Sequence, residues 1–542
     1  MSLSYIIDTK ERFAFWLAVL GSSYVVCKTL ISYFALPSTA DTLRGPKSQS
    51  WLIGNSEDYR LPYPNERFQR WVQEYGTTFP VYGFFGVREL VVGDTNAMSI
   101  ILNQTADFPK PASLINTTKH LVGDGVLAAQ GYEHKRQRKV LNPAFSMTVM
   151  RDISPMLMRV AHELRDSWKK ELSCSLPNSG VREIDVLRGF CKAALDMIGL
   201  AGFGSEFNSL HDSTNELASA FKELSISISL LKGLGLLTAF FPILRYLPIG
   251  SNVANQRNRY IMDRVGLQMI TDKKVEVQTL GIDAEALGKD LLSVMLRSNL
   301  QENSADRLDD ETLRAQIATF LLAGHETTAN ALTWGLHALA KLPSVQSKLR
   351  DEVLAFPDDS PSMDDLNAMP YLNNVVKEIL RMMPPVSTLR RIAREDSVLP
   401  LARPIVDKNG KTINEIFLRR GESLMVHIFA SNTSPDLWGP DAFEFRPERF
   451  DKLPEAVSGI PSLFGNLLTF SAGPKGCIGW RMAVIEMQAL FFTLIRTFEF
   501  GIDPGLEITS RFSFAIKPQI KGQEGNGPQL PLRVSLHPNT SL

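Results

Sequence analysis

The sequence predicts one large, mainly α-helical domain with small β-sheets. Apolar residues at helical spacing dominate after about residue 130, and short β-branched and aromatic runs occur within residues 80–92, 395–427 and 511–536. Of the 542 residues, 44% are hydrophobic, which is enough to bury a large core. We find no internal repeat, charged linker or change of composition after residue 45, so a single domain is the simplest architecture.

The N-terminal segment, residues 1–37, is predicted to be a transmembrane anchor. Phe13 to Leu36 is apolar apart from Lys28, and about 20 apolar residues are needed to span a bilayer. A lysine side chain can extend to the membrane surface, so Lys28 does not exclude a span. A cleaved signal peptide is the alternative, but the segment lacks a basic start and a small-residue cleavage site.

A proline/glycine hinge at residues 38–50 is expected to join the anchor to the main domain at residues 51–542. Arg44 and Lys47 follow the apolar segment, and basic residues beside a span favour the cytoplasmic side. We therefore expect the main domain to face the cytosol.

Charge and cysteine content exclude two classes of protein. Lys+Arg and Asp+Glu both number 58, so the chain lacks the basic excess that nucleic-acid binding requires. Its four cysteines are too few and too scattered for a disulfide scaffold, which favours a reducing compartment.

The elements of the main domain can be placed in order along the chain. Residues 80–92 predict a hairpin around a Phe-Phe-Gly turn. The longest helix should start after Asp309-Asp310-Glu311, whose charges suit a helix N-terminus, and end near Leu342-Pro343. Short strands are expected between residues 395 and 427, and a further hairpin pair in residues 511–536.

Cys477 is the strongest candidate for a chemical role. It lies in FSAGPKGCIG, residues 470–479, just before a helical stretch, where the helix dipole and backbone N–H groups favour a thiolate. The glycines let the backbone pass close to a flat, bulky group beside which Phe470 can pack, and Lys475 can neutralise acidic groups on a ligand. A buried structural cysteine is the alternative. No His or Cys stands at zinc-ligand spacing from Cys477, whereas a single thiolate suits haem iron.

The pattern F-x-x-G-x-x-x-C-x-G resembles the haem-binding loop of the cytochrome P-450 family. The resemblance implies the family's fold, a large helical haem domain with a minor β-rich region, and haem b as cofactor, with Cys477 as the axial ligand of its iron. The family's usual Arg or His two residues before the cysteine is replaced by Lys475, which keeps the positive charge but not the planar fork.

Residues 323–328, AGHETT, interrupt the middle of the long helix. Gly324 weakens the helix, and Thr327 and Thr328 can donate hydrogen bonds to carbonyls one turn earlier. A solvated polar stripe is the alternative interpretation. The segment is similar to the family's oxygen-activation motif, in which Glu326 and Thr327 would deliver protons during O₂ activation.

Two further motifs are expected to hold the haem and the fold. GYEHKRQRK, residues 131–139, resembles the family's W-x-x-x-R helix with His134 in place of Trp, so Arg138 and His134 are candidate haem-propionate contacts, as is Arg391. EILR and FRPERF resemble the family's Glu-Arg-Arg network; this would make Glu378, Arg381 and Arg449 structural residues.

The resemblance implies a membrane-anchored haem-thiolate monooxygenase that uses O₂ and two electrons to oxidise an apolar substrate. The chain has no dinucleotide fingerprint, so electrons should come from NADPH through a separate NADPH–cytochrome P-450 reductase, docked on Lys135, Arg136 and Lys139. The sequence as a whole resembles fungal microsomal members of the family. This resemblance implies that the protein is located in the endoplasmic reticulum membrane and that its substrate is lipophilic, such as a terpenoid or another secondary metabolite.

Substrate access and the pocket can also be placed on the sequence. Residues 226–249 are apolar and either dip into the bilayer as a substrate entrance or form ordinary core helices. Phe320, Ala323 and Val386 to Leu389 are expected to line the pocket, from their positions relative to the motifs. The alternative functions are a reductase-independent haem-thiolate isomerase or dehydratase, against which the Glu326-Thr327 pair argues, and a non-catalytic haem sensor.

Overall fold

The structure is a computed structural model that describes residues 16, 21–24, 38–50, 53–55, 66–83, 86–174, 181–212, 215–217, 219–220, 250–280, 288, 290–303, 306–512 and 514–538. Most of the expected anchor and all of the expected substrate entrance at 226–249 lie outside these residues. Within the described part of the chain, no helix combines the length and the apolar character needed to cross a bilayer.

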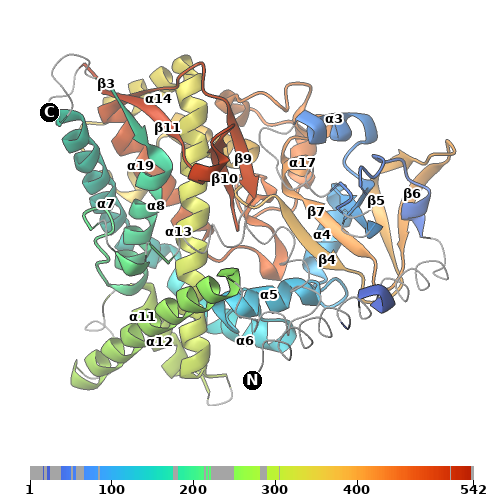
Figure 1. The fold of residues 1–542 in the computed structure, drawn as a ribbon, viewed down its shortest axis with the longest axis horizontal. Helices are drawn as coiled ribbons and strands as arrows, with labels where there is room; N and C mark the ends of the chain where they lie inside the picture. Colours follow the sequence, from blue (N-terminus) through green and yellow to red (C-terminus); the bar gives the residue numbers. More distant parts are fainter. Residues whose placement is uncertain are drawn as a thin grey trace, which may run out of the picture.

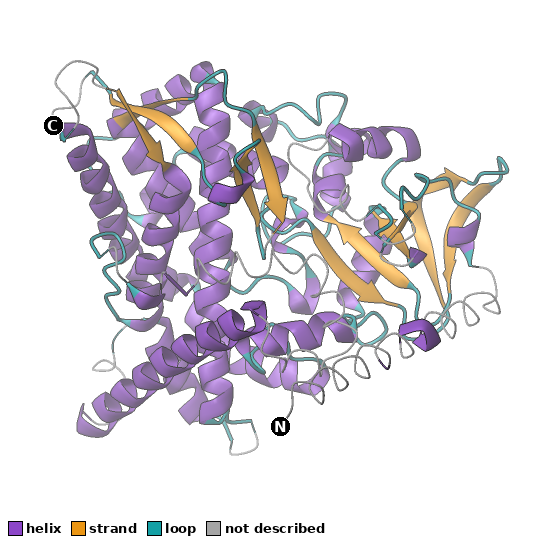
Figure 2. Cartoon of the chain, viewed as in Figure 1, coloured by secondary structure: helices purple, strands orange, loops and turns teal. Residues whose placement is uncertain are grey.

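The described chain is mainly helical with small sheets, as expected (Figure 2). Its α-helices are α3 (Glu66–Tyr75), α4 (Thr95–Asn103), α5 (Ala112–Val122), α6 (Gly131–Leu141), α7 (Met147–Ser173), α8 (Val186–Met197), α11 (Gly250–Leu280), α12 (Leu291–Gln301), α13 (Asp310–Lys341), α14 (Pro343–Ala355), α15 (Met363–Asn367), α16 (Pro370–Met382), α17 (Ile428–Asn432), α18 (Pro435–Trp438) and α19 (Trp480–Thr497). Three of these, α3, α4 and α5, precede residue 130, in a region where no helices were predicted.

The strands are β1 (Phe79–Tyr82), β2 (Arg88–Val92), β3 (Val181–Asp185), β4 (Thr388–Ile392), β5 (Ser397–Val406), β6 (Thr412–Leu418), β7 (Ser423–His427), β8 (Phe498–Gly501), β9 (Ile508–Phe512), β10 (Ile516–Ile520) and β11 (Pro531–Leu536). The largest sheet has the order β1-β2-β7-β4 and contains the expected hairpin of β1 and β2. Figure 1 shows this sheet and the β5–β6 hairpin on one side of the molecule, with the long helices on the other.

Helix α13 runs through the helical half of the molecule (Figure 1). It begins where the sequence predicts, because the Asp309 carboxylate accepts a hydrogen bond from the Thr312 N–H, and it ends at Lys341, before Pro343. Most of its residues are buried on all sides. At Gly335 an added Cβ would lie 2.6 Å from Ile379 of α16 and 2.9 Å from Phe491 of α19, so glycine permits this close packing.

The C-terminal strands differ in part from expectation. β9 and β10 form an antiparallel hairpin, but β11 pairs with β8 and with β3, which lies more than three hundred residues earlier in the chain. The sequence pattern showed a strand at β11 but not its partners, since pairing over such a distance leaves no local signal.

The segment expected to act as a hinge, residues 38–50, contacts the β-rich side of the molecule. The Ser38 hydroxyl donates to a carboxylate oxygen of Glu422 at 2.8 Å, and the Phe417 N–H donates to the Thr39 hydroxyl at 2.8 Å. Asp41 forms an ion pair with Arg88. These contacts attach the expected hinge to β2 and β6.

Candidate active site

The loop at residues 470–479 folds back on itself before α19 begins at Trp480. The Cys477 N–H donates to the Phe470 carbonyl at 2.9 Å, which closes the loop. Gly473 has φ +67°, and a Cβ there would lie 2.5 Å from the Leu102 carbonyl oxygen at the end of α4. The tight approach at Gly473 is therefore to the protein's own backbone, whereas the sequence suggested an approach to a ligand.

The Cys477 sulfur lies just before the N-terminus of α19, as expected. Burial raises the pKa of its thiol, while a hydrogen bond from the Gly479 N–H and the charge of Arg138 act to lower it. The side chain nevertheless keeps solvent-accessible surface, although Gly476 and Phe470 beside it are buried. The sulfur is therefore accessible to a ligand.

Basic side chains from four segments gather near this loop. They are Lys110, His134 and Arg138 of α6, Arg391 of β4 and Lys475. Burial and then the charges of Lys475, Arg138 and Lys110 lower the pKa of His134 to about 4. Burial and then Arg391 lower the pKa of Lys475 to about 8. Each charge in this basic cluster therefore opposes its neighbours.

The cluster has no anion of its own in the part of the chain that the structure describes. Its cations contact neutral groups instead: Arg138 donates to the Gly476 carbonyl at 3.1 Å, and Lys475 to the Ala129 carbonyl at 2.9 Å. Buried charges without partners are costly, so the cluster suits a ligand that brings negative charge. A porphyrin with two propionates would suit these cations, and the accessible Cys477 sulfur could hold its iron.

Lys110 is the member of the cluster that the sequence did not reveal. Its Nζ donates to the Leu127 carbonyl at 2.8 Å, and burial, followed by repulsion from Lys475 and Arg391, lowers its pKa to about 7. It stands between two prolines in FPKP, a pattern that signals a turn and no ligand. Only the folded chain brings it to residues more than two hundred positions away.

Thr327 and Glu326 take different places on α13. The Thr327 hydroxyl donates to the Ala323 carbonyl at 2.8 Å, as expected from the sequence, and both residues, like Gly324, keep partial exposure in the largely buried middle of the helix. One turn of helix separates them, so they lie on one face. Glu326 is buried, and its carboxylate forms an ion pair with Lys517 of β10 at 2.8 Å. His325 is also buried.

Glu486 of α19 is a second buried acid that the sequence did not single out. Burial raises its pKa to about 8, and a hydrogen bond with Thr328 of α13 acts in the opposite direction. Its Oε1 atom has no hydrogen-bond partner among the described residues. A neutral carboxylic acid therefore links the helix that follows Cys477 to the helix that carries Thr327.

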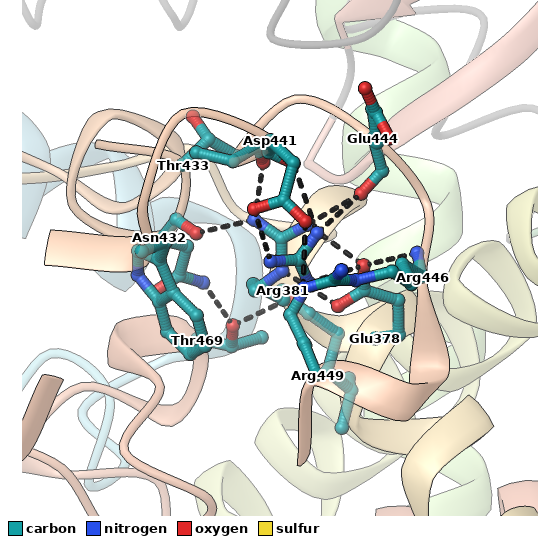
Figure 3. A network of polar contacts seen from close by, with 12 residues as sticks. Glu378, Arg381, Asn432, Thr433, Asp441, Glu444, Arg446, Arg449 and Thr469 are labelled. Atoms are coloured by element: carbon teal, nitrogen blue, oxygen red, sulfur yellow. Dashed lines mark hydrogen bonds and ion pairs between the residues drawn. The ribbon is translucent and has the colours of Figure 1, made fainter. Parts of the chain in front are cut away.

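Glu378, Arg381 and Arg449 come together as the sequence suggested (Figure 3). Arg381 binds both carboxylate oxygens of Glu378, at 2.7 and 2.8 Å, and Arg449 approaches the same carboxylate at 3.0 Å. Both arginines also donate to backbone carbonyls of the irregular segment between α17 and the 3₁₀ turn at Pro447–Asp451. All three side chains are buried, which suits a role in supporting the fold.

A chain of hydrogen bonds connects this network to the cysteine loop. Arg381 donates to the Asn432 carbonyl at 2.9 Å, and the Asn432 side chain contacts Thr469 and the Leu468 N–H at 2.8 and 2.9 Å. Thr469 in turn donates to the Leu380 carbonyl at 2.7 Å. Since Phe470 follows directly, the network sets where the cysteine loop begins.

Comparison with known proteins finds similar sequences along most of the chain. Residues 44–522 match the family model described as cytochrome P450. The Postia placenta protein named Cytochrome P450 monooxygenase 128 is 36% identical over 535 residues, covering 95% of this chain and 96% of the relative. Ganoderic acid synthetase CYP5150L8 of Ganoderma lucidum is 32% identical over 527 residues, covering 90% and 92%. Cytochrome P450 monooxygenase claP of Ampulloclitocybe clavipes is 33% identical over 505 residues, covering 91% and 92%.

Replacing Arg381 by Met should lower the free energy of unfolding by about 3–5 kcal/mol, because it leaves the Glu378 carboxylate buried without its bidentate partner. Denaturant unfolding measures the loss. Arg151→Met is the control: it removes an exposed ion pair with Asp364 and should cost less than about 1 kcal/mol. Equal losses in the two variants would contradict a structural role for the network.

Glu486→Gln should change how stability depends on pH. The pKa of Glu486 is raised in the folded protein to about 8, so this group favours folding at low pH and loses that contribution as the pH rises towards 8. The wild type should therefore lose stability relative to Glu486→Gln between about pH 5 and 8, by about 1.4 kcal/mol per pH unit at most. Thermal unfolding of both proteins across this range measures the difference, and parallel curves would refute it.

Lys110→Met should weaken haem retention while leaving the haem-free protein at least as stable, because it removes a repelled cation from the basic cluster. The loss of one charge-assisted bond to a carboxylate predicts roughly tenfold faster haem loss. The rate of haem transfer to a scavenging protein, with unfolding of the haem-free form, gives both quantities. Lys119→Met, which removes an exposed partner of Asp124, should change neither.

Proposed function

The chain belongs to the cytochrome P450 monooxygenase family, and on that premise we propose that it hydroxylates or otherwise oxidises a lipophilic small molecule with O₂ and electrons from a separate reductase. One oxygen atom enters the substrate, and the other leaves as water after taking up two electrons and two protons. The family uses haem and O₂. The observation that carries the proposal is the accessible Cys477 sulfur beside a buried basic cluster for which the described residues supply no carboxylate.

The residues of the chain have distinct tasks in this proposal. Bound haem supplies the iron at which O₂ is reduced and from which oxygen reaches the substrate. Cys477 holds that iron, with its thiolate stabilised by the Gly479 N–H and by Arg138. The basic cluster binds the propionates. The Thr327 hydroxyl, on the partly exposed face of α13, holds a proton, and Glu326 exchanges protons with it.

A lipophilic substrate is supported by apolar side chains that the sequence assigns to the pocket. Val386 and Leu389 keep partial exposure beside the buried residues 381–385, and Phe320 packs edge-on against Phe145 with ring centroids 5.5 Å apart. Apolar walls of this kind favour an apolar ligand. We propose that the substrate is a terpenoid or another secondary metabolite. The name of one relative, ganoderic acid synthetase, is compatible with a secondary metabolite.

We propose that electrons arrive from NADPH through NADPH–cytochrome P-450 reductase, but the docking surface differs from expectation. Arg136 is paired with Glu133 at 2.9 Å, and Lys139 with Glu302 at 2.5 Å and Asp306 at 3.1 Å. These carboxylates balance two of the three cations assigned to docking. Lys135 is exposed and remains a candidate for contact with an acidic partner.

Anchoring in the endoplasmic reticulum membrane, with the catalytic domain in the cytosol, is also part of the proposal. Its support is the apolar sequence from Phe13 to Leu36 and the basic residues Arg44 and Lys47 that follow it.

The reduced protein should give the carbon monoxide difference spectrum of a thiolate-bound haem, and Cys477→Ser should abolish it. Cys174→Ser, at another exposed cysteine, should leave the spectrum unchanged. Membranes that contain the wild type, reductase and NADPH should then convert members of a terpenoid panel to products with one added oxygen. A wild type without the thiolate spectrum, or turnover without reductase, would refute the proposal.

A further inference from the structure

The ion pair between Glu326 and Lys517 joins the centre of α13 to a hairpin near the C-terminus. Nζ of Lys517 lies 2.8 Å from Oε1 of Glu326, and the side chains are 8% and 3% exposed. Lysine and glutamate are seldom this deeply buried unless they are paired. Glu326 directly precedes Thr327, whose hydroxyl lies on the partly exposed face of the same helix.

The backbone around Lys517 is held firmly, which fixes where its side chain can reach. All residues of β10 are buried. The Trp334 Nε1–H of α13 donates to the Ile516 carbonyl at 2.9 Å, and the Ile516 N–H donates to the Pro385 carbonyl at 3.0 Å. β10 is therefore attached to α13 one residue before Lys517, and it presents the lysine to Glu326.

In the titratable groups on neighbouring elements, burial shifts the pKa in the direction that favours the neutral form. On α8, burial raises the pKa of the Cys191 thiol to about 11, although the charge of Lys517 acts to lower it. On α13, burial and then the charge of Lys517 lower the pKa of His325 to about 3. Asp185, at the end of β3, also acts on Cys191, and burial raises the pKa of Asp185. Lys517 is thus the cation that directly balances Glu326.

We propose that Lys517 is a positioning residue for proton delivery: it holds Glu326 as a carboxylate directed towards β10, and so sets how much of the electron supply ends in product. This inference rests on the proposed monooxygenase function. Each O₂ consumed requires two protons, which come from solvent. The Glu326 carboxylate accepts a proton and passes it on towards Thr327, while Lys517 keeps its own charge and restores the carboxylate.

Loss of the lysine charge should change the protonation state of Glu326. Without a cation, a buried carboxylate is disfavoured and takes up a proton that it no longer releases readily. Lys517→Met should therefore favour the protonated form of Glu326. Lys517→Arg keeps the charge and should keep the carboxylate. Lys521→Met is the matched control, because Lys521 lies directly after the same hairpin strand and pairs with Glu507 at 2.7 Å on the exposed surface.

Infrared difference spectroscopy tests the protonation state without any turnover. Lys517→Met should gain a protonated-carboxyl band that is absent from the wild type, Lys517→Arg and Lys521→Met. The band should disappear in the double variant Lys517→Met/Glu326→Gln. Glu486, whose pKa is raised by burial, contributes a constant band to all of these proteins and cancels in the differences.

The second measurement is the yield of product per NADPH consumed, with hydrogen peroxide release, in the haem-loaded protein with reductase. Lys517→Met should lower the yield on the order of tenfold, and Lys517→Arg should largely restore it. Glu326→Gln should show a similar loss, and the double variant should be no worse than Glu326→Gln alone, because both changes remove one function. The solvent isotope effect on turnover should rise in Lys517→Met.

The inference is overturned if Lys517→Met has no new carboxyl band, or if its product yield equals that of Lys521→Met, or if the losses in the double variant multiply. A wild type that binds haem through thiolate and forms product, with unaffected Lys517 variants, would refute this inference alone. A wild type without the thiolate spectrum would refute the proposed function instead, and the infrared result on Lys517 would still be interpretable.

Discussion

The interior of this protein is organised by the cost of burying charge. An ion taken out of water loses several kcal/mol of hydration, which only close partners can offset. Glu378 meets this requirement with two arginines, and Glu326 meets it with Lys517. The basic cluster beside Cys477 does not meet it with any carboxylate of the described residues. A dianionic cofactor would offset this imbalance, and the two balanced sites fix neighbouring elements.

These charged sites contact the same few helices, strands and loops. The network around Arg381 sets the start of the cysteine loop, and the loop leads into α19. α19 carries Glu486, which contacts Thr328 next to the hydroxyl residue of the proposed proton path. β10 reaches the opposite flank of that path through Lys517. The cysteine loop and the segment around Thr327 are thus connected through α19 and α13 by buried polar contacts.

Much of this arrangement could be predicted from local sequence. The limits of α13 follow from Asp309 and Pro343, and the position of Cys477 before a helix follows from the glycine-rich loop. The Glu378–Arg381 pair follows from helical spacing. Local pattern could not supply Lys110, Lys517 or the pairing of β11 with β3, because each depends on contacts between residues more than a hundred positions apart. Lys139 posed a similar difficulty: its charge is visible in the sequence, but its pairing with Glu302 and Asp306, which follow α12, is not.

The segment between α18 and the turn at Pro447 has a particular consequence for divergence among relatives. Arg381 and Arg449 bind it mainly through the carbonyl groups of residues 441, 442 and 444. Carbonyl groups are common to every amino acid, so substitution of the side chains there does not remove these contacts. A change at either arginine, in contrast, affects the whole segment at once.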